Sequence, residues 1–343
     1  MTGSALISSV ADACHNTIVE HHPENPQERA LWRKFRQASR VYITVALTCL
    51  LALMLVTRIG YQSGERLAGP VLLLLLPATM YFSANRFDII PALLVTMSLM
   101  CLGRDKLAGS GILLGVATMV KIYPVLVAPL VIRYLMVNRR RAFQWLSAYG
   151  LVMLAIATWT VAAYGWHAAV APYRVQFGRT LDVFTFFGTV LPAALGADSS
   201  GPRMVRAVVV LLVLALVGWG RPTELAGVLR RSAIVLIVFM SLQVFYSPQW
   251  VVWLTPFLTP LARERRAVLW LTIAWDLVTY LTFPIAFDLN PGASVIAALI
   301  DTRAVVMGAL VVTLGWAEFR ASASGVRQTI PAPAPPSAKR KGE

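Results

Sequence analysis

The stretch NRFDIIPALLVTMSLMCLGRDKLAGSGILLGVATMVKIYPVLVAP, residues 85–129, decides the fold of this chain. It opens with a polar segment that contains Asn85, Arg86 and Asp88, and continues through two apolar runs, the second of which ends at Lys121. Apolar runs with charges only at their ends are typical of membrane helices, because an ionisable group in the bilayer interior is costly. We expect the charged residues at these ends to take part in function.

The composition of the whole chain indicates an integral membrane protein. Of its 343 residues, 57% are hydrophobic and 14% are charged, whereas a soluble domain has about 45–50% and 25%. Only helices and closed barrels satisfy the backbone in lipid, and no barrel-type alternation is present. We predict an all-α, polytopic membrane helical bundle of about 10–11 transmembrane segments, some of them short or re-entrant.

The formal charge of +15 does not indicate a nucleic-acid partner. Lysine and arginine lie mainly at the ends of the apolar runs, where topology and lipid headgroups explain them. We therefore expect membrane lipids as partners and no nucleic acid. The three cysteines have no paired spacing, which predicts neither a disulfide framework nor a zinc site, and we assign no residues as metal ligands.

The chain divides into three parts. Residues 1–40 are polar and basic, and fit either an amphipathic interfacial helix or a solvated turn. They show no cleavable signal peptide. Residues 41–319 are predicted to form the transmembrane bundle, with an external loop at 164–203, and 320–343 a disordered, basic, Pro-rich tail. The apolar runs lie at 41–57, 69–84, 88–103, 107–121, 122–137, 143–163, 204–219, 232–247, 250–262, 267–287 and 293–316.

Basic clusters between the runs predict the orientation in the membrane. The positive-inside rule places them in the cytoplasm together with the C-terminal tail. The clusters are Arg139, Arg140 and Arg141, then Arg221, Arg230 and Arg231, and then Arg263, Arg265 and Arg266.

The orientation of the N-terminal part depends on whether 107–137 is one kinked helix or two short helices that meet at Lys121. One long helix would leave Lys121 in mid-membrane, at a cost on the order of a few kcal/mol, so we favour two helices. Lys121 and the segment 85–88 then face outside, as does the N-terminus. An external N-terminus leads us to expect a further helix upstream of Met1.

Two blocks of the sequence carry a family pattern. The first block consists of four segments: Asn85-Arg86-Phe87-Asp88, Leu107-Ala108-Gly109, Leu114-Gly115-Val116-Ala117 and Lys121-Ile122-Tyr123-Pro124. The second block is Tyr246-Ser247-Pro248-Gln249-Trp250, followed by Trp253 and Pro256. Together they resemble the GT-C superfamily of polyprenyl-phosphate-dependent glycosyltransferases. The pattern is most similar to the family 87 mannosyltransferases and the enzymes that add the first mannose to GPI anchors.

The resemblance implies a membrane enzyme that moves a sugar, expected to be mannose, from a polyprenyl-phosphate donor to an acceptor hydroxyl. The reaction would take place at the outer face of a bacterial plasma membrane, with a lipid or glycan as acceptor. The donor is a substrate rather than a cofactor, and use of a divalent metal stays open. No glycine-rich nucleotide loop is present, so a nucleotide sugar has no support as donor.

The sequence departs from the family at one point. In the family the main acidic residue lies in the first external loop, just after the first transmembrane helix. Here no apolar helix precedes residue 41, and no such acidic motif is found. We therefore leave the main catalytic acid unassigned and expect an incomplete N-terminus.

The first block supplies candidates for binding the donor phosphate. Lys121 and Arg86 are cations suited to stabilising charge on a leaving phosphate. In the alternative interpretation, Lys121 only extends toward the lipid headgroups and Arg86 only anchors its segment at the membrane interface. Asp88 is assigned a supporting role, and its alternative is to cap the helix that follows it.

Three further residues are candidates for a substrate rim. Tyr123 lies at the predicted membrane boundary, and Gln249 and Trp250 could hydrogen-bond and stack on a sugar. Their alternative is an ordinary interfacial aromatic belt with a Pro-broken helix start.

Asp276 is an intramembrane acid in the run 267–287 with no motif to explain it, and it could neutralise a cation or belong to a proton path. Asp301 and Arg303 are expected only to anchor the start of the last helix. Two other functions stay open: a non-catalytic or truncated GT-C relative that acts as a membrane partner, and a transporter or lipid flippase that uses Asp276.

Overall fold

The computed structural model describes residues 73–177, 222–243, 245–289 and 291–323, together with Leu50 and a few positions between 208 and 219. Within these ranges the regular structure is helical, without strands. The elements of the first half are η1 (Leu73–Leu75), α4 (Pro77–Asn85), α5 (Ile89–Gly103), α6 (Leu107–Val120), η2 (Tyr123–Leu126), α7 (Ala128–Leu135) and α8 (Arg139–Phe177). Those of the second half are α11 (Leu225–Ser241), η3 (Pro248–Trp250), α12 (Val251–Glu264), α13 (Arg266–Tyr280), η4 (Leu281–Ala286), α14 (Phe287–Leu289) and α15 (Ala293–Ala323).

Several helices are long and apolar enough to cross a membrane. Among the described residues there are three, at Arg139–Ala171, Arg266–Leu289 and Ala293–Ala321. The bent pair α4 and α5, which turns by 110°, makes a fourth if it counts as one span. The predicted all-α membrane bundle is therefore confirmed, although much of it consists of helices shorter than a full span. The predicted runs 41–57 and 204–219 lie largely outside the described residues.

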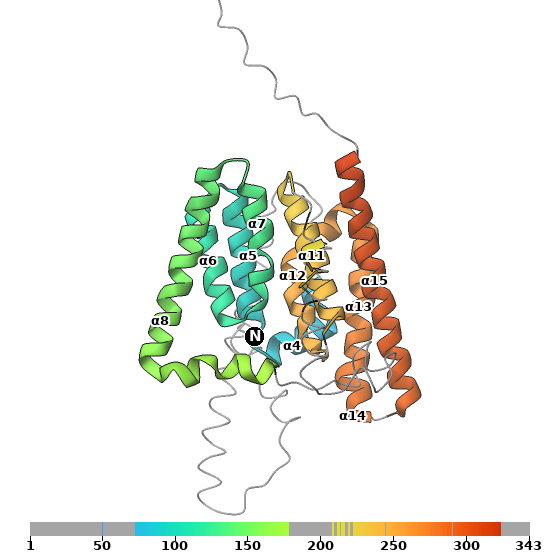
Figure 1. The fold of residues 1–343 in the computed structure, drawn as a ribbon. Helices are drawn as coiled ribbons and strands as arrows, with labels where there is room; N and C mark the ends of the chain where they lie inside the picture. Colours follow the sequence, from blue (N-terminus) through green and yellow to red (C-terminus); the bar gives the residue numbers. More distant parts are fainter. Residues whose placement is uncertain are drawn as a thin grey trace, which may run out of the picture.

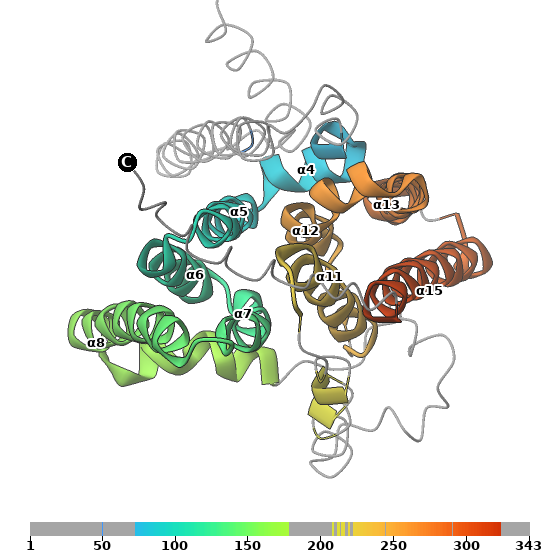
Figure 2. The same ribbon diagram turned by 90° about the horizontal axis from the view of Figure 1, so that it is seen from above.

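The helices form two groups that pack along one interface. In Figure 1, α5 to α8 stand on one side, and α11, α12, α13 and α15 on the other. Seen from above, α12 and α11 face the first group (Figure 2), and α12 contacts α5 while α11 contacts α7. The short helix α4 lies across one end of the bundle, against α12 and α13.

The chain reverses at Lys121, as predicted for two short helices. The α6 helix ends at Val120, and Lys121 is extended with φ −151° and ψ 133°. The chain then enters η2 and α7, whose Pro124 and Pro129 lack the amide hydrogens that a continuous helix would need. The prediction that 107–137 is two helices is confirmed.

Three helices extend beyond the approximate bounds predicted for their segments. The external loop expected from residue 164 is helical as far as Phe177, because α8 continues after a bend at Gly165, where φ is +82°. The remainder of that predicted loop lies outside the described residues. The run expected from 232 starts at Leu225, so Arg230 and Arg231 lie inside α11. The last helix ends at Ala323, inside the segment expected to be a tail.

The bundle has two chemically different ends. At the upper end in Figure 1 lie the α5–α6, α7–α8 and α12–α13 turns, the start of α11 and the end of α15. We call this the basic end, because most basic clusters fall there, including Arg141, which pairs with Asp105. The Lys121 end, opposite to it, holds the α4–α5 and α6–η2 junctions and η3.

Helices α6 and α8 approach closely through two glycines. A Cβ at Gly111 would lie 2.5 Å from the Trp145 carbonyl oxygen, and one at Gly115 would lie 2.4 Å from Val152 Cγ1. Such small-residue contacts let membrane helices pack without a hydrophobic driving force. The sequence GSGILLG therefore fixes the spacing between α6 and α8.

Alanine at Gly111 is expected to destabilise the protein by about 1–3 kcal/mol, since the backbone of α8 would have to move away. Gly109→Ala is the matched control, because its Cβ would meet only Cys101 Sγ at 3.7 Å. Thermal unfolding of the two purified variants in detergent checks this. Equal unfolding temperatures would show that the α6–α8 contact does not need glycine.

Candidate functional site

The centre of the candidate site is the buried carboxylate of Asp88. It has no exposed surface, and Lys121 Nζ lies 2.8 Å from its Oδ1 and 3.0 Å from its Oδ2. The indole Nε1 of Trp253 donates a hydrogen bond to Oδ1. Both carboxylate oxygens are therefore engaged, one of them by a residue 165 positions away in the chain.

Asp88 does not cap the helix that it precedes. It occupies the N-cap position of α5, yet its side chain makes no capping hydrogen bond. The alternative reading of Asp88 as a helix cap is wrong, because the carboxylate turns toward Lys121 and Trp253 instead. A buried charge requires such a partner.

Lys121 is held from three sides. Its ammonium group pairs with Asp88, and it lies 4.6 Å from the ring centroid of Phe87 and 5.6 Å from that of Trp253. Its side chain is still 19% exposed. Lys121 is thus a fixed cation with one open side, which is the property that an anion-binding group needs.

The rings of six residues form an aromatic cluster next to this pair. The cluster consists of Tyr123, Phe239, Phe245, Tyr246, Trp250 and Trp253. Tyr123 stacks on Trp253 with centroids 4.4 Å apart, and Trp253 contacts Trp250 at 5.3 Å. These contacts bring the two blocks of the sequence pattern together at the Lys121 end.

The other predicted site residues lie at different depths. Arg86 is exposed at the C-terminal end of α4, beside Asp88 in the chain. Gln249 is half-buried in η3. Tyr123 and Trp250, 1% and 3% exposed, lie in the core rather than on an exposed rim. Sugar binding by Tyr123, Gln249 and Trp250 stays a prediction.

Asp276 has a structural partner that the sequence did not reveal. Its Oδ1 accepts the backbone N–H of Ala78 at 2.9 Å. Its Oδ2 accepts the backbone N–H and the hydroxyl of Thr79 at 2.9 and 2.7 Å. Asp276 thus caps the first turn of α4 from a different helix, in place of the missing local cap. With both oxygens used in this way, its contacts indicate neither an ion path nor a cation partner.

Asp276→Asn is expected to destabilise the protein by about 1–3 kcal/mol, because the amide nitrogen cannot accept the hydrogen bonds that one carboxylate oxygen accepts. The change should leave the chemistry of the folded fraction intact. Asp301→Asn is the control, since Asp301 is exposed on α15. Thermal unfolding measures both variants, and unchanged stability of Asp276→Asn would contradict the capping role.

Arg303 lies deeper than predicted. It was expected to anchor a helix start, but it lies well inside α15, is 2% exposed, and its guanidinium carbon is 3.5 Å from the ring centroid of Tyr246. Sequence reasoning therefore missed Arg303 as a residue near the site, and it assigned no role to Trp253. The available signal was an arginine inside an apolar run, which is rare without a function.

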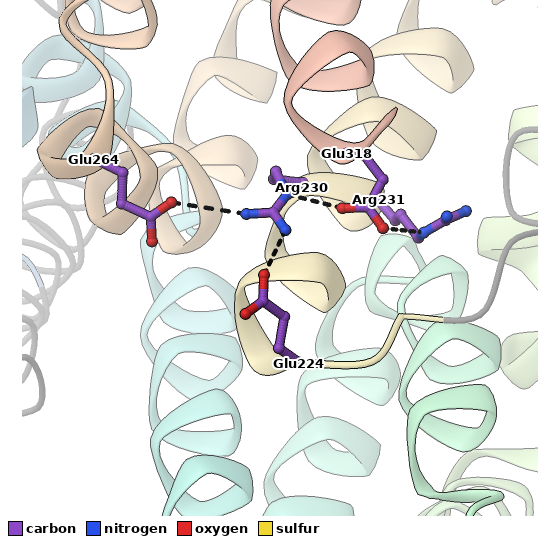
Figure 3. Close-up of polar contacts among 5 residues, drawn as sticks. All are labelled: Glu224, Arg230, Arg231, Glu264 and Glu318. Atoms are coloured by element: carbon purple, nitrogen blue, oxygen red, sulfur yellow. Dashed lines mark hydrogen bonds and ion pairs between the residues drawn. The ribbon is translucent and has the colours of Figure 1, made fainter. Parts of the chain in front are cut away.

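A second ionic cluster lies at the basic end, away from Lys121. Figure 3 shows Arg230 at its centre, with each guanidinium nitrogen directed at a different carboxylate. Nε donates to Glu318 at 2.8 Å, Nη2 donates to Glu224 at 2.7 Å, and Nη1 lies 3.7 Å from Glu264. Arg231 donates to the other oxygen of Glu318 at 2.9 Å. This cluster joins the ends of α11, α12 and α15.

A family model decides which enzymes this chain is related to. The model of glycosyltransferase family 87 matches residues 30–248, which is more than half of the chain. The chain belongs to glycosyltransferase family 87. No curated protein and no solved structure matches it.

The match of this family 87 glycosyltransferase includes the whole first block and the second block as far as Pro248. It identifies a membrane-embedded enzyme that uses a sugar donor and an acceptor. Within the described part of the chain, no group of three or more His, Cys, Asp or Glu side chains could hold a metal ion. The polar centre that the structure does assemble from these blocks is the pair of Asp88 and Lys121.

Proposed function

We propose that this family 87 glycosyltransferase moves a sugar, mannose, from a polyprenyl-phosphate donor to an acceptor hydroxyl on the outer face of the membrane. The observation that supports this proposal is the pair of Lys121 and buried Asp88. A partly exposed ammonium group at the end of a membrane helix suits the phosphate of a lipid whose chain lies in the bilayer.

The reaction needs a cation where negative charge develops. The acceptor oxygen attacks the anomeric carbon of the donor sugar, and the bond from that carbon to the phosphate oxygen breaks. The bonding electron pair leaves with the phosphate, whose charge rises, and a general base takes the acceptor proton. Lys121 would stabilise the departing phosphate, and exposed Arg86 could bind its remaining oxygens.

Asp88 would position Lys121 rather than act as the base. Its carboxylate has no exposed surface, and Lys121 and Trp253 already hydrogen-bond to it, which favours holding the lysine over taking the proton of an incoming acceptor. The supporting role predicted for Asp88 becomes a positioning role in this proposal.

Transfer of labelled sugar tests the proposed function. Membranes that contain the chain are incubated with polyprenyl-phosphate mannose, labelled in the sugar, and label is followed into lipid and glycan fractions. Label should move in these membranes and not in matched membranes without the chain. Absence of transfer from confirmed full-length protein would overturn the proposal and favour the non-catalytic partner. Flux of the intact donor across the membrane without transfer would favour the flippase.

The proposed orientation places the Lys121 end outside and the basic end, with the C-terminus, in the cytoplasm. It follows from the positive-inside rule, since most basic clusters lie at one end of the bundle. Ile122 and Val137, 52% and 79% exposed, lie at the two ends. In a background without the native cysteines, Ile122→Cys should react with a membrane-impermeant thiol reagent in intact cells. Val137→Cys should react only after lysis, and the reverse pattern would invert the orientation.

A further inference from the structure

Two tyrosine hydroxyls in the aromatic cluster are buried without a hydrogen-bond partner. The Tyr123 and Tyr246 side chains are 1% and 7% exposed, and neither hydroxyl oxygen is hydrogen-bonded within the described part of the chain. Buried polar groups are almost always paired, since an unpaired one destabilises the fold. Phenylalanine would fill both positions at a lower cost, so stability alone does not explain the hydroxyls.

Both tyrosines belong to the aromatic cluster, which contacts Lys121 through Trp253. Tyr123 stacks on Trp253, the residue that donates to Asp88. Tyr246 meets Trp250 edge-on at 5.5 Å, and Trp250 contacts Trp253. Two hydroxyls without hydrogen-bond partners, from blocks far apart in the chain, thus lie in one cluster beside Lys121, the cation proposed to bind the phosphate.

Arg303 changes the hydrogen-bonding character of the Tyr246 hydroxyl. Its guanidinium lies on the ring of Tyr246, 3.5 Å from the centroid, an arrangement that fixes the orientation of the ring. A positive charge on a phenol ring also draws electron density from its hydroxyl, which makes the hydroxyl a stronger hydrogen-bond donor. The buried arginine therefore favours Tyr246 as a donor to an electron-rich oxygen.

We propose that the hydroxyls of Tyr123 and Tyr246 hydrogen-bond to the sugar of the donor, and that the aromatic cluster is the sugar subsite beside the phosphate site of Lys121. Sugars present apolar C–H faces that suit aromatic rings, and hydroxyl groups that suit buried polar tips. Lys121 and Phe87, 19% and 44% exposed, form the open edge of this subsite. The proposal rests on the proposed function, because it assigns the sugar part of the same donor.

Tyrosine-to-phenylalanine variants separate binding from folding. Tyr123→Phe and Tyr246→Phe remove only the hydroxyls, so each variant should unfold at the wild-type temperature or above it. Tyr149→Phe is the matched control, since the hydroxyl of Tyr149 is paired with Thr118 at 3.2 Å and its ring stacks on Trp145. It should lower the unfolding temperature and leave donor binding unchanged.

Equilibrium binding of two probes to the purified full chain is the decisive test. The probes are polyprenyl phosphate with and without mannose. Tyr123→Phe and Tyr246→Phe should each weaken binding of the mannosylated probe by about 3–10-fold, the effect of one lost hydrogen bond, and leave binding of the bare probe unchanged.

The outcomes are distinguishable. Equal affinity of wild type and both variants for the mannosylated probe would overturn the sugar subsite while leaving the proposed function intact. Weakening of both probes alike would also overturn it, since the hydroxyls would then serve the phosphate. Failure of the wild type to bind either probe would overturn the proposed function, and the sugar subsite with it.

Discussion

The double variant Asp88→Asn/Lys121→Gln is expected to transfer sugar at least about 100-fold more slowly than the wild type, the usual loss when one preorganised group that stabilises transition-state charge is removed. The two amides are uncharged polar side chains, so no buried charge is left without its partner, but the cation is gone. The measurement is the initial rate of transfer from polyprenyl-phosphate mannose, normalised to the amount of folded protein.

The double variant is preferable to a single change at Lys121. Lys121→Met alone would leave the buried Asp88 carboxylate without its ion pair, at a cost of about 3–5 kcal/mol, and lost activity would then report unfolding. Lys106→Gln is the matched control, because Lys106 is exposed at the basic end. It should transfer at the wild-type rate, and a double variant that also did so would remove Lys121 from the mechanism.

Arg230→Ala is expected to lower the free energy of unfolding by about 3–5 kcal/mol, the loss found when one partner of a buried ionic cluster is removed. The Arg230 side chain is 8% exposed, and that of its closest buried partner, Glu318, is 13% exposed. Without Arg230, Glu318 would keep its pair with Arg231, and the Glu264–Arg230 link between α12 and α11 would be lost. The exposed Glu224 and Glu264 can be hydrated and should contribute less.

Chemical or thermal unfolding in detergent measures this effect. Arg140→Ala is the control, since Arg140 is exposed in the first turn of α8 and should change stability by less than about 0.5 kcal/mol. Arg231→Ala should fall between the two. An Arg230→Ala variant as stable as Arg140→Ala would show that the cluster in Figure 3 does not hold α11, α12 and α15 together.

The parts of the fold that depend on local sequence were predictable. Apolar runs with charged ends predicted the membrane bundle, and the energetic cost of a lysine in mid-membrane predicted the break at Lys121. That break places Lys121 and Asp88 at the same end of the bundle, where they form an ion pair. The two blocks of the family pattern predicted the enzyme class that the family match later showed.

The parts that depend on long-range contacts were not predictable. Asp276 had no visible partner because the backbone groups that it caps lie 197 and 198 positions away. The predicted start of α11 was wrong because Arg230 looked like a turn residue. Its charge is compensated by Glu264 of α12 and Glu318 of α15, which lets the helix continue through it. The roles proposed for Tyr246 and Trp253 depend on the stacking of Tyr123 on Trp253, a contact between residues far apart in the chain.

The position of the donor phosphate can be measured by photocrosslinking. A polyprenyl phosphate with a photoreactive group beside its phosphate is bound to the purified full chain, irradiated, and the adducts are mapped by mass spectrometry. We expect adducts at Phe87 and Ile122, the exposed side chains next to Lys121. These adducts should be lost in Asp88→Asn/Lys121→Gln. Adducts at the basic end, or adducts beside Lys121 that persist unchanged in the double variant, would contradict a phosphate site at Lys121.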